Sequence, residues 1–136
     1  MIAGIGTDRV LIARVEQALA RFGERFEHRV FTREELRQAE AKGHTARRLA
    51  MLFAAKEAVS KALGTGFHQG VCARHIETIH QPSGKPEVFL HEGAARAAER
   101  LGVDRVHVSL TDDDGVAMAF AVAEVIGISE SGEGGA

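Results

Sequence analysis

The stretch 48–63 carries the residues best suited to chemistry. Glu57 and Lys61 lie one helical turn apart, so their carboxylate and ammonium groups share one face of a helix that is otherwise rich in Ala and Leu. A turn of small residues, 64–66, follows, with Gly64 as the C-terminal cap. A charged pair beside such a turn suits a charged ligand. An exposed salt bridge on a core helix explains the same pair.

Two other spots carry polar groups that a fold alone does not need: Asp8, after a Gly-x-Gly start, and segment 109–113. Two carboxylates can hold Mg²⁺ when substrate phosphate and water fill the other octahedral positions, and a lysine would neutralise more phosphate charge. Such groups, helped by the backbone amides of turn 64–66, suit phosphoryl transfer. Taken singly, Asp8 also fits a helix N-cap and 112–114 an ordinary turn, while 64–66 is too short for a Walker loop.

Chain length, net charge and cysteine content limit the class of protein to which this sequence can belong. A chain of 136 residues is long enough for one domain with its own core, and a net charge of −2 argues against bulk binding of nucleic acid. One cysteine and no zinc-type spacing fit a reducing cytoplasm. We find no export signal and no apolar run long enough to span a bilayer. We therefore expect a cytoplasmic protein without membrane partners.

The hydrophobic periodicity predicts an α+β domain over 1–126 and a disordered Ser/Gly/Glu-rich tail over 127–136. Thr32 and Glu35 form a capping-box pattern, Thr45 is a candidate cap for the long helix, and Gly6 is expected to end the first strand. The last two strands should form an antiparallel hairpin. The predicted helices are 10–22, 32–41, 48–63 and 92–101, and the predicted strands are 2–5, 75–80, 87–90, 106–111 and 116–126.

Five segments, in one order and spacing from residue 1 to about 126, carry a family resemblance. They are Gly4–Asp8, Phe31–Leu36, Phe53–Gly66, Gly84–Pro86 and Val106–Thr111. Together they strongly resemble the holo-[acyl-carrier-protein] synthases, the small group I 4′-phosphopantetheinyl transferases. The resemblance implies that family's α+β fold, an antiparallel sheet packed with a long central helix.

The resemblance also implies an activity in fatty acid biosynthesis: transfer of 4′-phosphopantetheine from coenzyme A to a serine of apo acyl carrier protein, with release of adenosine 3′,5′-bisphosphate. Asp8 and Glu57 match the family's Mg²⁺ ligands, and Lys61 matches a lysine near the same phosphates; these three are the implied catalytic residues. Glu57, directly or through a metal-bound water, is our candidate base.

Further positions match stretches that surround the coenzyme or the carrier in the family. A basic face of the first helix is expected to dock the acidic carrier, and family members of this size are typically homotrimers with sites between subunits. The expected coenzyme A contacts are Lys56, Ser60, Gly64, Thr65, Gly66, Lys85, Pro86, Ser109 and Thr111, to which we add Arg48, and the expected docking residues are Arg14, Arg21 and Arg25.

Two departures from the family pattern matter. Asp112 stands where many relatives have histidine, and this acid would repel phosphate unless it pairs with a cation or faces away. Leu52 stands where relatives often have arginine; Arg48, one turn earlier, could reach the same region. A binding module without turnover and a metal-dependent phosphohydrolase are the alternatives to a transferase.

Overall fold

The computed structural model describes residues 1–127, so the predicted tail lies outside the described residues except for Gly127. The elements in chain order are β1 (Ile2–Leu11), α1 (Ile12–Phe22), α2 (Glu24–Val30), α3 (Arg33–Lys42), α4 (Thr45–Ala62), a 3₁₀ turn η1 (Ala73–His75), β2 (Ile76–His80), β3 (Pro86–Leu90), α5 (Glu92–Leu101), β4 (Arg105–Asp113) and β5 (Val116–Glu124). This is the expected α+β domain.

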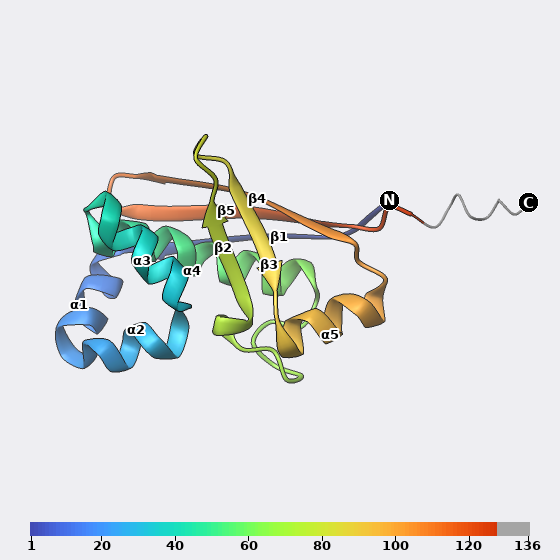
Figure 1. Ribbon diagram of the computed structural model, residues 1–136, viewed down its shortest axis with the longest axis horizontal. Coiled ribbons are helices and arrows are strands. Elements are labelled where there is room, and N and C mark those ends of the chain that lie inside the picture. Colours follow the sequence, from blue (N-terminus) through green and yellow to red (C-terminus); the bar gives the residue numbers. More distant parts are fainter. Residues whose placement is uncertain (128–136) are drawn as a thin grey trace, which may run out of the picture.

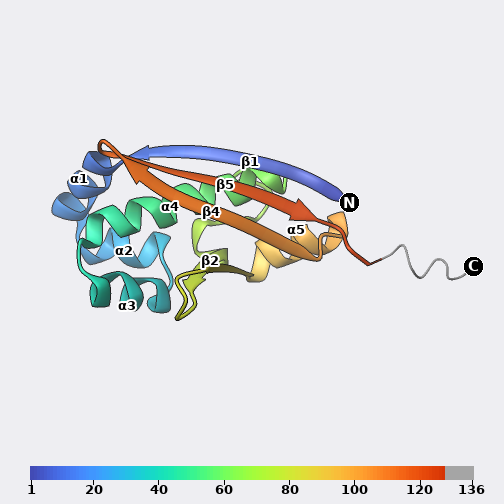
Figure 2. The same ribbon diagram turned by 90° about the horizontal axis from the view of Figure 1, so that it is seen from above.

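One long helix lies along one face of a three-stranded antiparallel sheet, whose strand order is β1-β5-β4. The β2–β3 hairpin forms a second, two-stranded antiparallel sheet that crosses in front of β4 and β5 (Figure 1). Seen from above, β1, β5 and β4 lie side by side over α4, with α1, α2 and α3 gathered at one end and α5 at the other (Figure 2). No helix within residues 1–127 is long and apolar enough to cross a membrane.

The alternation of side chains along β5 explains why α4 packs on this sheet. Every second residue from Ala117 to Ala123 is a buried alanine. The facing helix is also rich in buried alanines, among them Ala54, Ala55 and Ala58. Small side chains on both surfaces allow the helix axis to approach the sheet closely. The predicted antiparallel pairing of β4 with β5 is confirmed.

β1 approaches α4 more closely still, because two of its residues have no side chain. A Cβ added at Gly4 would lie 1.9 Å from the carbonyl oxygen of Ala62, and one at Gly6 would lie 1.9 Å from that of Ala58. No real Cβ tolerates such distances, so only glycine fits either position. The two glycines are packing residues within a strand.

This contact corrects the prediction that Gly6 ends the first strand. β1 continues to Leu11 and pairs with β5 along its length. The alternative that Asp8 caps a helix is therefore wrong: α1 begins at Ile12, after an N-cap at Leu11. The apolar residues 10–12 suit a strand end and a helix start equally well, which is why periodicity placed the boundary too early.

Besides the start of α1, the helices differ from the sequence prediction at two places. The capping box of Thr32 and Glu35 is confirmed, with the Glu35 amide 3.2 Å from Thr32 Oγ1 and the Thr32 amide 2.9 Å from Glu35 Oε1. α2 was not predicted, and it follows Gly23, whose φ of 54° breaks the helix. The N-cap of α4 is His44 rather than Thr45, without a side-chain capping bond.

Replacing Gly6 by alanine should test the contact between β1 and α4. The new Cβ would meet backbone atoms, the Ala58 oxygen at 1.9 Å and the Ala62 nitrogen at 2.8 Å, which cannot rotate away. We expect Gly6→Ala to lower the free energy of unfolding by about 3 kcal/mol or more. Gly127→Ala, where nothing lies within 4 Å of the new Cβ, is the matched control and should unfold like the wild type in urea.

Candidate active site

The glycine contact brings Asp8 to the middle of α4. Gly4, Gly6 and Asp8 alternate along β1 and therefore share the face that packs on the helix. Since β1 and α4 run in opposite directions at this contact, the residue after Gly6 on that face lies near the turn that carries Glu57 and Lys61. Residues 49 or more positions apart thus meet at one place on the molecule.

Lys61 forms its ion pair across this contact. Its ammonium donates to Asp8 Oδ1 at 2.9 Å and to the Thr7 carbonyl oxygen at 3.2 Å. The Lys61 side chain remains half exposed, whereas that of Asp8 is mostly buried. The pair predicted within one helix face, Glu57 with Lys61, is therefore not the ion pair that forms. Instead the bond to Asp8 raises the pKa of Lys61 and keeps it charged.

The second oxygen of Asp8 is buried and lacks a hydrogen-bond partner among the described residues. Glu57 lies beside it, and burial, together with the negative charge of Asp8, raises the pKa of the Glu57 carboxyl. A buried carboxylate oxygen without a donor is costly, and a neighbouring carboxylate adds to that cost. A cation between Asp8 and Glu57 would remove both penalties.

A divalent ion of the Mg²⁺ type fits this pair. Such an ion binds oxygen and keeps several water or substrate oxygens, so one or two carboxylates suffice. Within residues 1–127 no group of three or more His, Cys, Asp or Glu side chains could hold a metal ion. The protein would therefore supply Asp8 and Glu57 and leave the remaining positions to a ligand and water.

The turn after α4 is closed by its own backbone. Gly64, with φ 76°, follows the C-cap Leu63; its amide bonds to the Lys61 oxygen at 2.9 Å, and the Thr65 amide bonds to the Ser60 oxygen at 3.1 Å. This is a Schellman motif. The Gly66 amide also bonds to the Ser60 oxygen. All three amides are therefore already used within the chain, and contact of Gly64, Thr65 and Gly66 with coenzyme A stays a prediction that cannot rest on free amides.

Two expected coenzyme contacts lie inside the protein. Lys56 is fully buried and uses its three ammonium hydrogens on Glu35 Oε1 and on the carbonyl oxygens of Ala73 and Ile76. Ser60 is 2% exposed and bonds to the carbonyl oxygen one turn earlier. We therefore remove Lys56 from the coenzyme-binding set, because it has no donor left for a phosphate. The backbone oxygen of Ser60 supports the turn, and a contact of Ser60 with coenzyme A stays a prediction.

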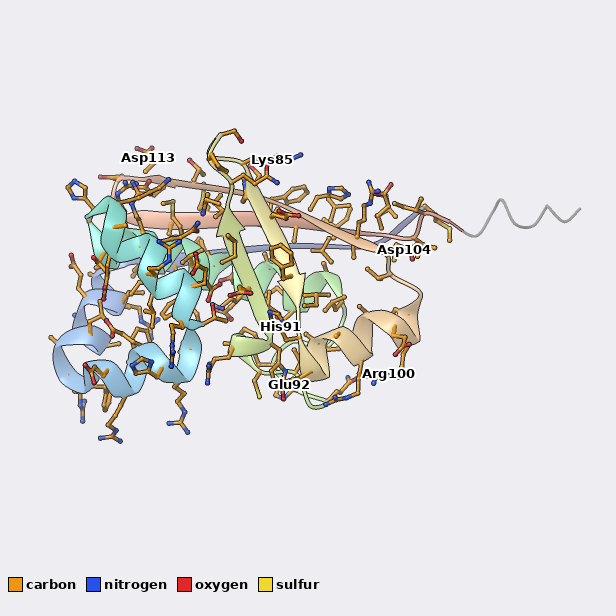
Figure 3. All side chains as sticks on the ribbon, viewed as in Figure 1. Lys85, His91, Glu92, Arg100, Asp104 and Asp113 are labelled. Carbon is orange, nitrogen blue, oxygen red and sulfur yellow. The ribbon has the colours of Figure 1, made fainter. Side chains whose placement is uncertain are left out.

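Other expected contacts lie away from Asp8 and Glu57. Ser109 and Thr111 are exposed on the face of the sheet opposite α4, because β4 alternates. Lys85 and Pro86 line an open groove of about 620 Å³ between β3 and β4. Lys85 stands at the tip of the β2–β3 hairpin (Figure 3). One chain does not bring these four residues to the carboxylate pair.

Asp112 is paired with a cation, which is one of the two conditions under which it would not repel phosphate. It turns toward α4 and accepts a hydrogen bond from Arg47 at 2.8 Å. Sequence reasoning missed Arg47, although an acid in this place needed a cation. Arg48 donates to the Gly43 carbonyl oxygen at 3.1 Å and lines a small pocket with Leu52, so it does reach the region of Leu52. That pocket does not include Asp8 or Glu57.

The three arginines expected to dock a partner lie on α1 and α2. Arg14 and Glu57 line one pocket of about 500 Å³ with an apolar floor that includes Phe53. The guanidinium carbons of Arg21 and Arg25 lie 5.2 and 5.9 Å from the ring centroid of Phe22, which is 44% exposed. Sequence reasoning placed Phe22 in the core stripe and missed this exposed aromatic between two cations.

The carboxylate pair should destabilise the protein at neutral pH when no metal is present. The folded state raises the pKa of Glu57, so the stability that its protonated form contributes is present below the ordinary value of 4.5 and is lost as pH rises through the raised pKa. Glu57→Gln should therefore raise Tm in chelator at pH 7, and the gain should shrink as the pH approaches 4.5. Glu99→Gln on α5 is the control. Equal Tm values for wild type and Glu57→Gln at pH 7 would contradict repulsion between the two carboxylates.

Comparison with known proteins finds relatives along nearly the whole chain. The chain is 49% identical over 122 residues to a holo-[acyl-carrier-protein] synthase of Halorhodospira halophila, covering 90% of this chain and 97% of the relative. A Neisseria meningitidis crystal structure of the same name matches with a TM-score of 0.84 and 41% identity, covering 91% and 99% of the two chains. A Helicobacter pylori structure, a complex with coenzyme A, matches with a TM-score of 0.79 and 28% identity, covering 88% and 99%.

The family model of the 4′-phosphopantetheinyl transferase superfamily matches residues 4–121. This range begins at the first glycine of β1 and includes the whole of α4, β4 and most of β5. It therefore contains both carboxylates and the elements that bring them together. The chain belongs to the 4′-phosphopantetheinyl transferase superfamily.

Proposed function

We propose that the chain transfers 4′-phosphopantetheine from coenzyme A to a serine of apo acyl carrier protein, releases adenosine 3′,5′-bisphosphate, and serves fatty acid biosynthesis. The observation that carries the proposal is the unpartnered, buried oxygen of Asp8 beside the raised-pKa carboxyl of Glu57. The names of the matched synthases, and the coenzyme A in one of their structures, support the substrates. A cytoplasmic location, expected from the single cysteine, stays a prediction.

The reaction exchanges one phosphorus–oxygen bond for another. The serine hydroxyl oxygen attacks the phosphorus next to pantetheine, the bond from that phosphorus to the bridging oxygen breaks, and adenosine 3′,5′-bisphosphate leaves with the electron pair. Glu57 is the candidate acceptor of the serine proton. Lys61 stabilises the charge on the leaving phosphate.

We propose Mg²⁺ as the cofactor, held by Asp8 and Glu57. When bound, it neutralises the charge of the pyrophosphate. Asp8 is well suited to this role, because Lys61 occupies one of its oxygens while the other faces Glu57 without a donor. Small oxygen-binding ions require few protein ligands, which agrees with a two-carboxylate site.

We propose a homotrimer in which neighbouring chains complete each site. Ser109 and Thr111 lie on the outer sheet face, which also presents Ile5, Met118 and Phe120, all more than 40% exposed. An exposed apolar surface of this kind is typical of an interface. Packing against a neighbour would cover the apolar side chains and allow one chain's Ser109 and Thr111 to approach the next chain's Asp8 and Glu57.

The acidic carrier would dock on α1 and α2. Arg21 and Arg25 surround the exposed ring of Phe22, a combination that attracts acid groups and buries apolar surface. Arg14 lies in the pocket that contains Glu57, so a carrier guided along this face arrives with its serine near the candidate base. Charge complementarity would mainly increase the rate of association.

The binding-module alternative loses its only support, because Asp112 is paired with Arg47 and need not repel phosphate. One experiment separates all three readings. The chain, coenzyme A, Mg²⁺ and an apo carrier are mixed, and the carrier's mass is followed. A gain of one phosphopantetheine is expected. Free phosphopantetheine without a gain would indicate a phosphohydrolase, and coenzyme binding without either product would indicate a binding module.

In the same assay, Asp8→Asn and Glu57→Gln should each lower the transfer rate by at least about 100-fold while the protein stays folded. Asp8→Asn removes the charged ligand, and Glu57→Gln removes ligand and base together. Glu99→Gln, the same chemical change on the exposed face of α5, should transfer at the wild-type rate. Wild-type turnover by either site variant would remove the metal and base assignments.

Charge reversal at Arg14 and Arg21 should test the docking face. We expect the double variant Arg14→Glu/Arg21→Glu to raise KM for the carrier about tenfold at low salt with little change in kcat, and wild-type KM should rise with ionic strength. Arg100→Glu on α5, at the opposite end of the molecule, is the control (Figure 3). An unchanged KM would show that Arg14 and Arg21 do not contribute to docking of the carrier.

A further inference from the structure

A fully buried ion pair holds α4 at the residue that precedes Glu57. Lys56 Nζ lies 2.8 Å from Glu35 Oε1, and neither side chain is exposed to solvent. The same ammonium donates to the carbonyl oxygen of Ile76 at 2.6 Å and to that of Ala73 at 3.1 Å. Three bonds from three directions leave the ammonium no freedom to move.

The carboxylate of Glu35 is held as firmly. Oε1 also accepts the Thr32 amide at 2.9 Å, and Oε2 accepts the Thr78 amide at 2.9 Å. The ion pair therefore ties together the start of α3, the middle of α4, and β2 with the turn before it. These contacts come from segments that are 17 to 43 residues apart in the chain.

Stability alone is a poor explanation for such a pair. Moving two charges out of water is costly, and apolar side chains of similar volume often stabilise a fold as well or better. Instead, the pair fixes the rotation of α4 about its own axis. Around Lys56 the buried residues of α4 are mostly alanines, such as Ala54, Ala55 and Ala58. Their small side chains offer little resistance to rotation of the helix. Charge-assisted hydrogen bonds require specific angles.

The direction of Lys56 determines where Glu57 points. Successive side chains on an α-helix differ by about 100° around the axis. When Lys56 is held toward Glu35 and β2, Glu57 turns toward β1 and Asp8. A small rotation or slide of α4 would separate the Glu57 carboxylate from Asp8 without unfolding the helix.

We propose that Lys56 and Glu35 are positioning residues that hold Glu57 at the distance from Asp8 needed to bind the divalent ion. The inference rests on the proposed function for the identity of the ion and goes beyond it in naming what sets the metal affinity. Lys56 and Glu35 touch neither ion nor substrate; they act through the orientation of α4.

The test is a double variant, Lys56→Met/Glu35→Gln, which removes both charges together and avoids leaving one of them buried alone. Binding of Mn²⁺ to the full chain is measured by the electron paramagnetic resonance of the free ion, and the Mg²⁺ concentration for half-maximal transfer is measured separately. The dissociation constant for Mn²⁺ and the Mg²⁺ concentration for half-maximal transfer should each rise by about 10-fold or more, the usual effect of removing groups that orient metal ligands. KM for the carrier at saturating Mg²⁺ should stay unchanged.

Arg37→Gln is the matched control, because it breaks an exposed ion pair with Glu34 on α3 and should leave Mn²⁺ binding unchanged. A lower Tm with wild-type Mn²⁺ affinity in the folded double variant would mean that the pair only stabilises the fold, and would overturn the proposal. If the double variant does not fold, Glu35→Asp, which keeps both charges but shortens the reach of the carboxylate toward Lys56, is judged by the same criterion. Wild-type protein that binds Mn²⁺ but transfers nothing would contradict the proposed function and leave the Mn²⁺ comparison valid.

Discussion

The backbone contact between β1 and α4 is the constraint on which the site depends. Gly4 and Gly6 allow the strand to touch the carbonyl oxygens of the helix, at a separation that no side chain would tolerate. Two residues further along the same strand face, Asp8 meets Lys61 and Glu57. The glycines therefore have an indirect but strict role: they set the distance between the two carboxylates that would hold the proposed ion.

The long helix is held on several sides, and each side has a different physical character. Alanines of β5 let it approach the sheet, and glycines of β1 let it touch the strand. The buried pair of Lys56 with Glu35 fixes its rotation about its axis. Apolar packing is strong but nearly insensitive to small rotations, whereas charged hydrogen bonds are directional. A site built from side chains of two separate elements needs both kinds of contact.

The proposed site residues are divided between the two faces of the main sheet. Asp8, Glu57 and Lys61 belong to the helix side, while Ser109 and Thr111 belong to the outer side with exposed apolar residues. Such a division is a geometric reason for assembly, because a single chain cannot bend its sheet to bring the two faces together. Neighbouring chains can join one inner edge to another's outer face. The proposed trimer would therefore cover apolar surface and complete the sites together.

Several elements could be predicted from local sequence, because motif spacing on a helix or strand is a local property. The capping box, α5 and the final hairpin were predicted in this way and are confirmed. Asp8, Glu57 and Lys61 were singled out as candidates, and their roles stay predictions. Local patterns could not tell that Gly6 packs within a strand, that Lys56 is buried, or that Arg47 pairs with Asp112. Each of these depends on which distant element lies opposite, and only the tertiary structure decides that, since burial and partners arise from contacts between segments far apart in the chain.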